Sequence, residues 1–86
     1  MEDIKNLLLE SINKENWEEI RKIVNDIIKN PEKLKKVNAW HFSEFVKDFV
    51  VVYDRWNEME QHRRELYKDS LKYHAEKMLE KAIGEQ

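Results

Sequence analysis

The chain has 86 residues, a net charge of −2, and nearly equal charged (40%) and hydrophobic (41%) fractions. One Gly and one Pro are too few for the turns of a multi-strand protein, and without Cys there is no disulfide framework or thiol chemistry. The small negative charge argues against a dedicated nucleic-acid-binding domain, which is usually strongly basic. We therefore expect a single all-α domain over residues 1–86.

The N-terminal stretch MEDIKNLLLESIN is acidic and amphipathic, which is not the pattern of a signal peptide. The longest apolar run, FVVVY, is far shorter than the ~20 residues of a membrane span. These features predict a cytoplasmic protein, in the host cytoplasm if it is viral. The bias toward Ile, Lys, Asn and Glu is typical of AT-rich bacteria, archaea and their viruses, and suggests a phage or viral origin as a hypothesis.

Apolar spacing in the first 38 residues predicts two or three short helices. Apolar residues at positions 4, 7, 8 and 12 share one helical face. Asn16 can cap the next helix, with Glu19 three positions later as in a capping box, and Pro31 suits the first position of a further helix capped by Asn30. Asn38 is the next candidate cap. The predicted helices cover 3–12, 17–29 and about 31–37.

Residues 39–83 contain neither Gly nor Pro, and Gly84 follows where a C-cap glycine is common. The apolar residues from 42 to 59 fall on one broad helical face, with Val50 at its flank and Val51 pointing away from it. Phe49 and Trp56 lie near its centre, and we expect both to be buried. The pattern predicts one long helix over about 39–83, despite the β preference of the valine run.

Such a helix is too long for the domain that carries it. Forty-five helical residues span about 68 Å, whereas a compact domain of this size is roughly 30 Å across. Either the second half projects and associates with a partner, or the helix breaks into a hairpin near EMEQHRRE, giving a compact bundle that needs no partner. That stretch holds none of the residues that turns favour, so we expect the continuous helix.

The stretch EQHRRE places charged residues on the apolar face of the predicted long helix. This interruption suggests an antiparallel homodimer in which two such faces form a bundle or coiled-coil-like seam. Its two-fold axis would lie near residues 62–63 and pair Glu60 of one chain with Arg63 or Arg64 of the other. Polar groups on a helical seam can set register at some cost in stability. The predicted dimer seam comprises Glu60, Arg63, Arg64, Tyr67, Leu71, His74 and Met78.

No motif for catalysis, cofactor binding or metal binding is present in the sequence. His41, His62 and His74 are far apart, and none belongs to a Glu-x-x-His pair. The single Gly excludes a glycine-rich phosphate loop. We therefore expect a protein that is not an enzyme and has no cofactor or metal.

Two surfaces are candidates for partners. Trp40 and Val51 lie on one side of the long helix and form a possible protein-binding patch. A helix-turn-helix across Asn30 and Pro31 would instead present basic residues to nucleic acid. An N-terminal helix-turn-helix followed by a long oligomerising helix is similar in layout to phage small terminase subunits, although no sequence motif supports the similarity. The residues that would contact DNA are Lys33, Lys35, Lys36 and Asn38.

The sequence therefore favours a small protein-binding adaptor or inhibitor that self-associates through its long helix. The alternatives are a DNA-binding regulator or packaging factor, and a structural or designed bundle without activity. A homodimer, a protein partner and no membrane contact are expected.

Overall fold

A computed structural model describes residues 2–80, and every regular element in that range is helical. The predicted all-α class is therefore confirmed, and the first two helices match their predicted ranges to within one residue. No helix in the described range is long and apolar enough to cross a bilayer. Gly84, the predicted C-cap, lies outside the described residues. The elements are α1 (Glu2–Asn13), α2 (Trp17–Lys29), α3 (Pro31–Leu34), α4 (Ala39–Arg55), the 3₁₀ turn η1 (Trp56–Glu58) and α5 (Gln61–Leu79).

The three asparagines predicted as caps all begin helices. The side chain of Asn16 accepts a hydrogen bond from the backbone N–H of Glu19, at 3.2 Å. Asn30 and Asn38 cap α3 and α4 in the same way, over 3.1 and 3.0 Å. Each bond satisfies one of the backbone donors that a helix start leaves without a partner. Local sequence therefore sets where these three helices begin.

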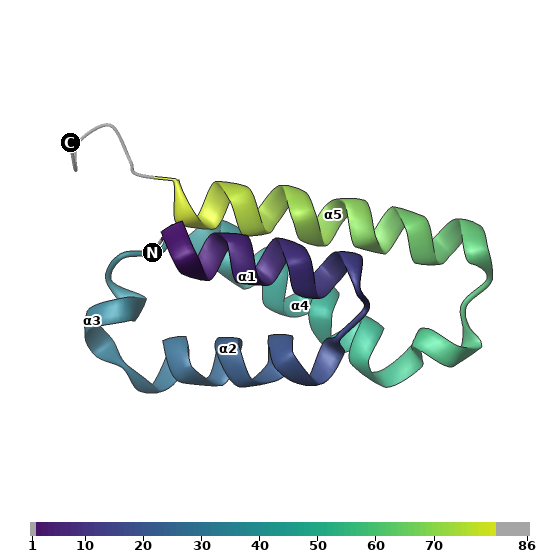
Figure 1. The fold of residues 1–86 in the computed structure, drawn as a ribbon, viewed down its shortest axis with the longest axis horizontal. Helices are drawn as coiled ribbons and strands as arrows, with labels where there is room; N and C mark the ends of the chain where they lie inside the picture. The colour runs from purple at the N-terminus through teal and green to yellow at the C-terminus, as the bar shows by residue number, and fades with distance from the viewer. Residues whose placement is uncertain (1, 81–86) are drawn as a thin grey trace.

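The four longer helices run along the long axis of the molecule, and the short α3 crosses one end (Figure 1). α5 packs closely on both α4 and α1, and α1 packs on α2. Backbone contacts between α2 and α4 are sparse. The bundle is therefore closed on three of its sides and open on the fourth, between α2 and α4.

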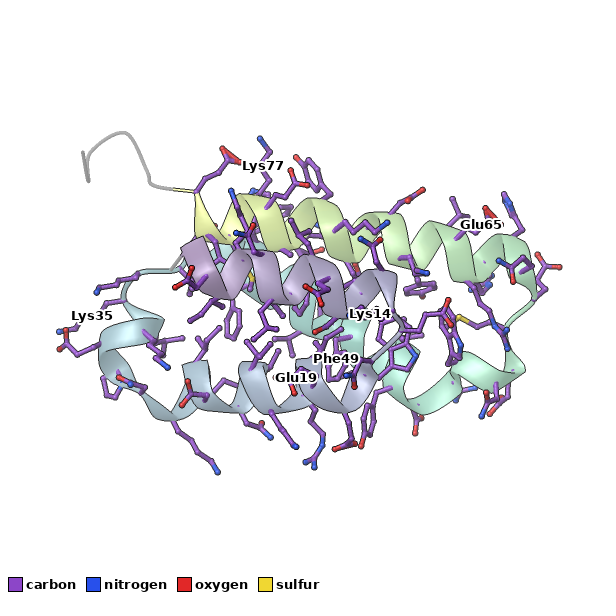
Figure 2. The ribbon with its side chains drawn as sticks, in the orientation of Figure 1. Lys14, Glu19, Lys35, Phe49, Glu65 and Lys77 are labelled. Carbon is purple, nitrogen blue, oxygen red and sulfur yellow. The ribbon has the colours of Figure 1, made fainter. Side chains whose placement is uncertain are left out.

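The core is made of aliphatic side chains from all four longer helices around the phenylalanines of α4. Figure 2 shows Phe49 among the side chains between the helices, whereas Lys35, Glu65 and Lys77 lie at the outer edges. Phe49 is buried, as predicted, whereas Trp56 is only half-buried and packs on the ring of Trp17. The fully buried large side chains are Leu8, Ile12, Ile20, Ile27, Phe45, Val52, Leu71 and Met78.

The prediction of one continuous helix over 39–83 is wrong. The helix ends after Arg55, and the chain passes through η1 and reverses, so that α5 returns along α4 (Figure 1). The backbone N–H of Asn38 donates to the carbonyl of Met78 at 2.8 Å, which holds the two ends of this hairpin together. The described part of the chain measures up to 41 Å in length, which a 68 Å helix would exceed. The hairpin alternative is the one observed.

The reversal contains neither Gly nor Pro, and Asn57 in η1 is its one residue of a type that turns favour. Met59 and Glu60 are extended with φ of −85° and −75°, which any residue adopts, so no glycine is needed. The Arg64 Nε donates to the carbonyl of Trp56 at 3.0 Å, and its guanidinium lies 4.9 Å from the centre of the Trp56 ring. Met59 is buried in the core. Tertiary contacts of residues 56–64 therefore stabilise a break that the local sequence marks only with Asn57.

The two central valines of α4 lie opposite to their predicted positions. Val51, expected on the back of the helix, is half-buried against the core. Val50, expected at the flank of the buried face, is 57% exposed. The hairpin accounts for this difference: α5 packs back on α4 and adds a second covered side to it, while the side that carries Val50 faces the opening between α2 and α4.

Candidate functional site

The open side of the bundle forms an apolar groove between α2 and α4, with a volume of about 520 Å³. This volume is within the range of protein ligand sites. The groove extends for about two helical turns, or roughly 10–12 Å, along each helix. Its lining residues are Arg21, Val24, Asn25 and Ile28 on α2, and Val46, Phe49, Val50, Tyr53 and Asp54 on α4.

Large apolar side chains line this groove while remaining in contact with solvent. Ile28 is 51% exposed, Val50 57% and Tyr53 46%. Single exposed apolar residues are common on protein surfaces, but these three line the same concave surface. Val46, Val50 and Tyr53 recur at every turn of α4, as do Val24 and Ile28 on α2. The facing sides of α2 and α4 therefore each carry an apolar stripe, and a third helix could pack against both stripes.

A polar cluster bridges the two helices at one end of the groove. The Tyr53 hydroxyl donates a hydrogen bond to the Glu18 carboxylate, and Arg21 pairs with the same carboxylate at 2.9 Å. These bonds lower the pKa of Glu18, with Arg21 as the main cause and Tyr53 as the next. The same hydrogen bond raises the pKa of Tyr53. This cluster ties the start of α2 to the end of α4, and the rest of the lining is apolar except for Asn25 and Asp54.

The residues of the predicted dimer seam are divided between the core and the surface. Leu71 and Met78 are fully buried within this chain, because α5 packs its apolar face on α1 and α4. Arg64, Tyr67 and His74 are half-buried, while Glu60 and Arg63 are exposed. The burial of Leu71 and Met78 leaves them unavailable to a second chain in this fold. Self-association itself stays a prediction.

The predicted patch of Trp40 and Val51 is not a continuous surface. Val51 is half-buried, whereas Trp40 is 62% exposed at the start of α4. The neighbours of Trp40 are instead the rings of His41 and His74, with centroids 4.8 and 5.8 Å away. Trp40 therefore belongs to an aromatic cluster at the ends of α4 and α5.

The lysines proposed to contact DNA lie on and after α3, which is one turn long instead of the predicted seven residues. Lys33 forms an ion pair with Asp26, and Lys35 lies 4.0 Å from Glu32. Lys36 is exposed, and the Asn38 side chain accepts the bond from His41 N–H that caps α4. Acidic neighbours thus partly neutralise the basic surface of this segment.

Sequence reasoning missed the contact between His41 and His74. Their Nδ1 atoms lie 3.0 Å apart, although the residues are 33 positions apart in the sequence. The antiparallel register of α4 and α5 brings the two histidines together. The contact could have been predicted from the sequence only by treating residues 39–83 as a hairpin. Elsewhere along the same contact, the Ser70 hydroxyl donates to Asp48 at 2.5 Å.

Among residues 2–80, no group of three or more His, Asp or Glu side chains is arranged to hold a metal ion. No protein-family model, curated protein or solved structure matches this chain.

Proposed function

We propose that this chain is a protein-binding module, and that the α2–α4 groove holds an amphipathic helix of another protein. The observation that supports the proposal is the apolar groove at the one side of the bundle where neighbouring helices make few backbone contacts. A helix placed there would pack against α2 and α4 together, as helices pack against each other in four-helix bundles.

The lining defines the chemistry of the guest. Apolar side chains on the guest at positions i, i+3 or i+4, and i+7 would match the two-turn stripes of α2 and α4. Arg21 and Asp54 line the same groove, so each offers an opposite charge to a polar residue on the edge of the guest. The guest is thus a short helix with one apolar face and charges of both signs beside it.

Binding would bury apolar surface that the free chain exposes to water. Ile28, Val50 and Tyr53 are each about half exposed, so a guest gains contact area without opening the core. The groove is already formed, which limits the cost of conformational change on binding. A second copy of the chain is the competing occupant, and it would agree with the self-association expected from the sequence.

The test places a photo-crosslinking amino acid, p-benzoylphenylalanine, at position 50 in cells that produce the chain. Leu66, which is 56% exposed on α5 outside the groove, is the matched control position. We expect a protein to be captured from position 50 and not from position 66, with the cross-link on a helix of the stated pattern. Capture of the chain itself would identify self-association and contradict the proposed guest.

A synthetic peptide of the captured helix then allows a measurement of affinity by calorimetry. Val50→Glu should weaken binding at least about 10-fold, which corresponds to about 1.4 kcal/mol. Leu66→Glu should bind like the unmodified chain, and both variants should keep their stability within about 0.5 kcal/mol because both positions are exposed. Equal binding by the two variants would overturn the proposal.

A further inference from the structure

One carboxylate in the lining of the groove has no partner within the described part of the chain. Asp54 lies on the last turn of α4, lines the groove and is exposed to solvent. Among the described residues, its side chain forms neither a hydrogen bond nor an ion pair. The Asp54 carboxylate is therefore free to bind a group that enters the groove.

The other charge in the lining, that of Arg21, is offset within the chain. Both oxygens of the Glu18 carboxylate are occupied, one by Arg21 at 2.9 Å and the other by the Tyr53 hydroxyl. Lys22 also acts electrostatically on Glu18, but it does not line the groove. Arg21 and Glu18 thus form a neutral pair, and the charge left over in the lining is that of Asp54.

An aromatic ring lies beside this free carboxylate. Tyr53 precedes Asp54 and lines the same groove. Its hydroxyl bond to Glu18 and its contact with the Phe49 ring, with centroids 5.5 Å apart, hold the ring in place. Tyr53 is nevertheless 46% exposed, so part of the ring is open to a guest. A ring face attracts an ammonium or guanidinium group within about 6 Å, and a carboxylate forms a charge-assisted hydrogen bond with the same group.

The carboxylate and the ring lie at one end of the groove. The bond from Tyr53 to Glu18 marks the end that is formed by the start of α2 and the end of α4, whereas Ile28 and Val46 line the opposite end. An apolar stripe by itself would fit the groove in either direction. A cation that must reach Asp54 instead fixes the direction and the register of the guest.

We propose that the guest helix carries a lysine or arginine at one end of its apolar stripe, and that this cation binds Asp54 and lies against the ring of Tyr53. The inference rests on the proposed function and names the residue by which the groove selects its guest. A guest without the cation would cover the Asp54 carboxylate and leave it without a partner, which costs affinity. Asp54 is therefore a specificity-determining residue.

The test uses a synthetic peptide of the helix that p-benzoylphenylalanine at position 50 captures, with affinities measured by calorimetry. Asp54→Asn should weaken binding about 5-fold, and Asp54→Lys at least about 10-fold. A peptide with Glu in place of its lysine or arginine should bind the unmodified chain at least about 10-fold more weakly, and Asp54→Lys should restore most of that loss. Asp69 is also exposed and without a partner in the described range, but it lies on α5 outside the groove. Asp69→Lys is therefore the matched control and should bind like the unmodified chain.

Two results would overturn the inference while leaving the groove as the binding site. One is a captured helix with no lysine or arginine within one turn of either end of its apolar stripe, and the other is equal binding by Asp54→Lys and Asp69→Lys. In both cases the loss of affinity in Val50→Glu would still support the proposed function. Capture of no protein from position 50, or of the chain itself, would overturn the proposed function and this inference with it. Urea denaturation verifies that the Asp54 and Asp69 variants remain folded.

Discussion

The helix α4 meets α5 along one flank and α2 along the other, and the two contacts differ in closeness and in polarity. Toward α5, three polar contacts follow the antiparallel register: Asn38 to Met78, His41 to His74, and Ser70 to Asp48. Toward α2, the bond from Tyr53 to Glu18 links the helices at one end of an apolar groove. The α5 flank is closed, and the α2 flank is open.

The connections between the helices account for this difference. A short link through η1 joins α4 to α5, and the chain reverses directly onto the helix it has just left. By contrast, α3 and residues 35–38 separate α2 from α4. The broad apolar face of α4 exceeds what α5 covers, so part of it remains exposed as the groove. An apolar face that is wider than one neighbouring helix can cover is thus divided here between the core and an exposed groove.

The largest expected effect on stability is that of replacing Phe49. Phe49 is buried and also lines the groove. Phe49→Ala should lower the free energy of unfolding by about 3–5 kcal/mol, because it leaves a cavity the size of a ring. The adjacent Val50→Ala should cost less than about 0.5 kcal/mol, because Val50 is exposed. Urea denaturation measures both, and similar losses at positions 49 and 50 would contradict the open flank.

The next effect tests the closed flank. Leu71 on α5 is fully buried, whereas Leu66 on the same helix is largely exposed. Leu71→Ala should cost about 2–5 kcal/mol, while Leu66→Ala should change stability by less than about 0.5 kcal/mol. Equilibrium unfolding of the two variants gives the comparison. If Leu71→Ala had little effect, α5 would not be packed against α1 and α4.

A smaller effect is expected at the turn that closes the hairpin. Arg64→Met removes the hydrogen bond to the Trp56 carbonyl and the contact with its ring. We expect a loss of about 1–2 kcal/mol, since each contact contributes about 0.5–1 kcal/mol. Arg63→Met is the matched control at an exposed neighbour and should be close to neutral. Equal losses in the two variants would show that Arg64 has no special role in the reversal.

The smallest effect concerns the polar end of the groove and depends on pH. The folded-state pKa of Glu18 lies below 4.5, its ordinary value, because Arg21 and Tyr53 donate to the carboxylate. Its contribution is therefore fully present above pH 4.5 and is lost as the pH falls through the lowered folded-state pKa. The urea midpoint should fall on acidification, and Glu18→Gln should reduce the slope. An unchanged slope would show that this cluster contributes nothing to stability.

Local sequence was sufficient to predict the starts of α2, α3 and α4 and the extent of the first two helices. Asn16, Asn30 and Asn38 cap helices as predicted, because a cap needs only a side chain and backbone groups two or three residues away. The burial of Phe49 also followed from periodicity alone, since it lies at the centre of the apolar face of α4.

The break at residues 56–60 was decided by tertiary contacts, because its backbone angles are open to any residue and its stability comes from Arg64 and the burial of Met59. Once the chain reverses there, the packing of the helices determines that Val51 is half-buried and Val50 exposed, and the register of α4 and α5 determines that His41 meets His74. A helical wheel gives the angle of each side chain about its own axis and contains no information on neighbouring helices. The sequence by itself therefore determined the helices and their apolar faces, while the packing of those faces decided the groove and the histidine pair.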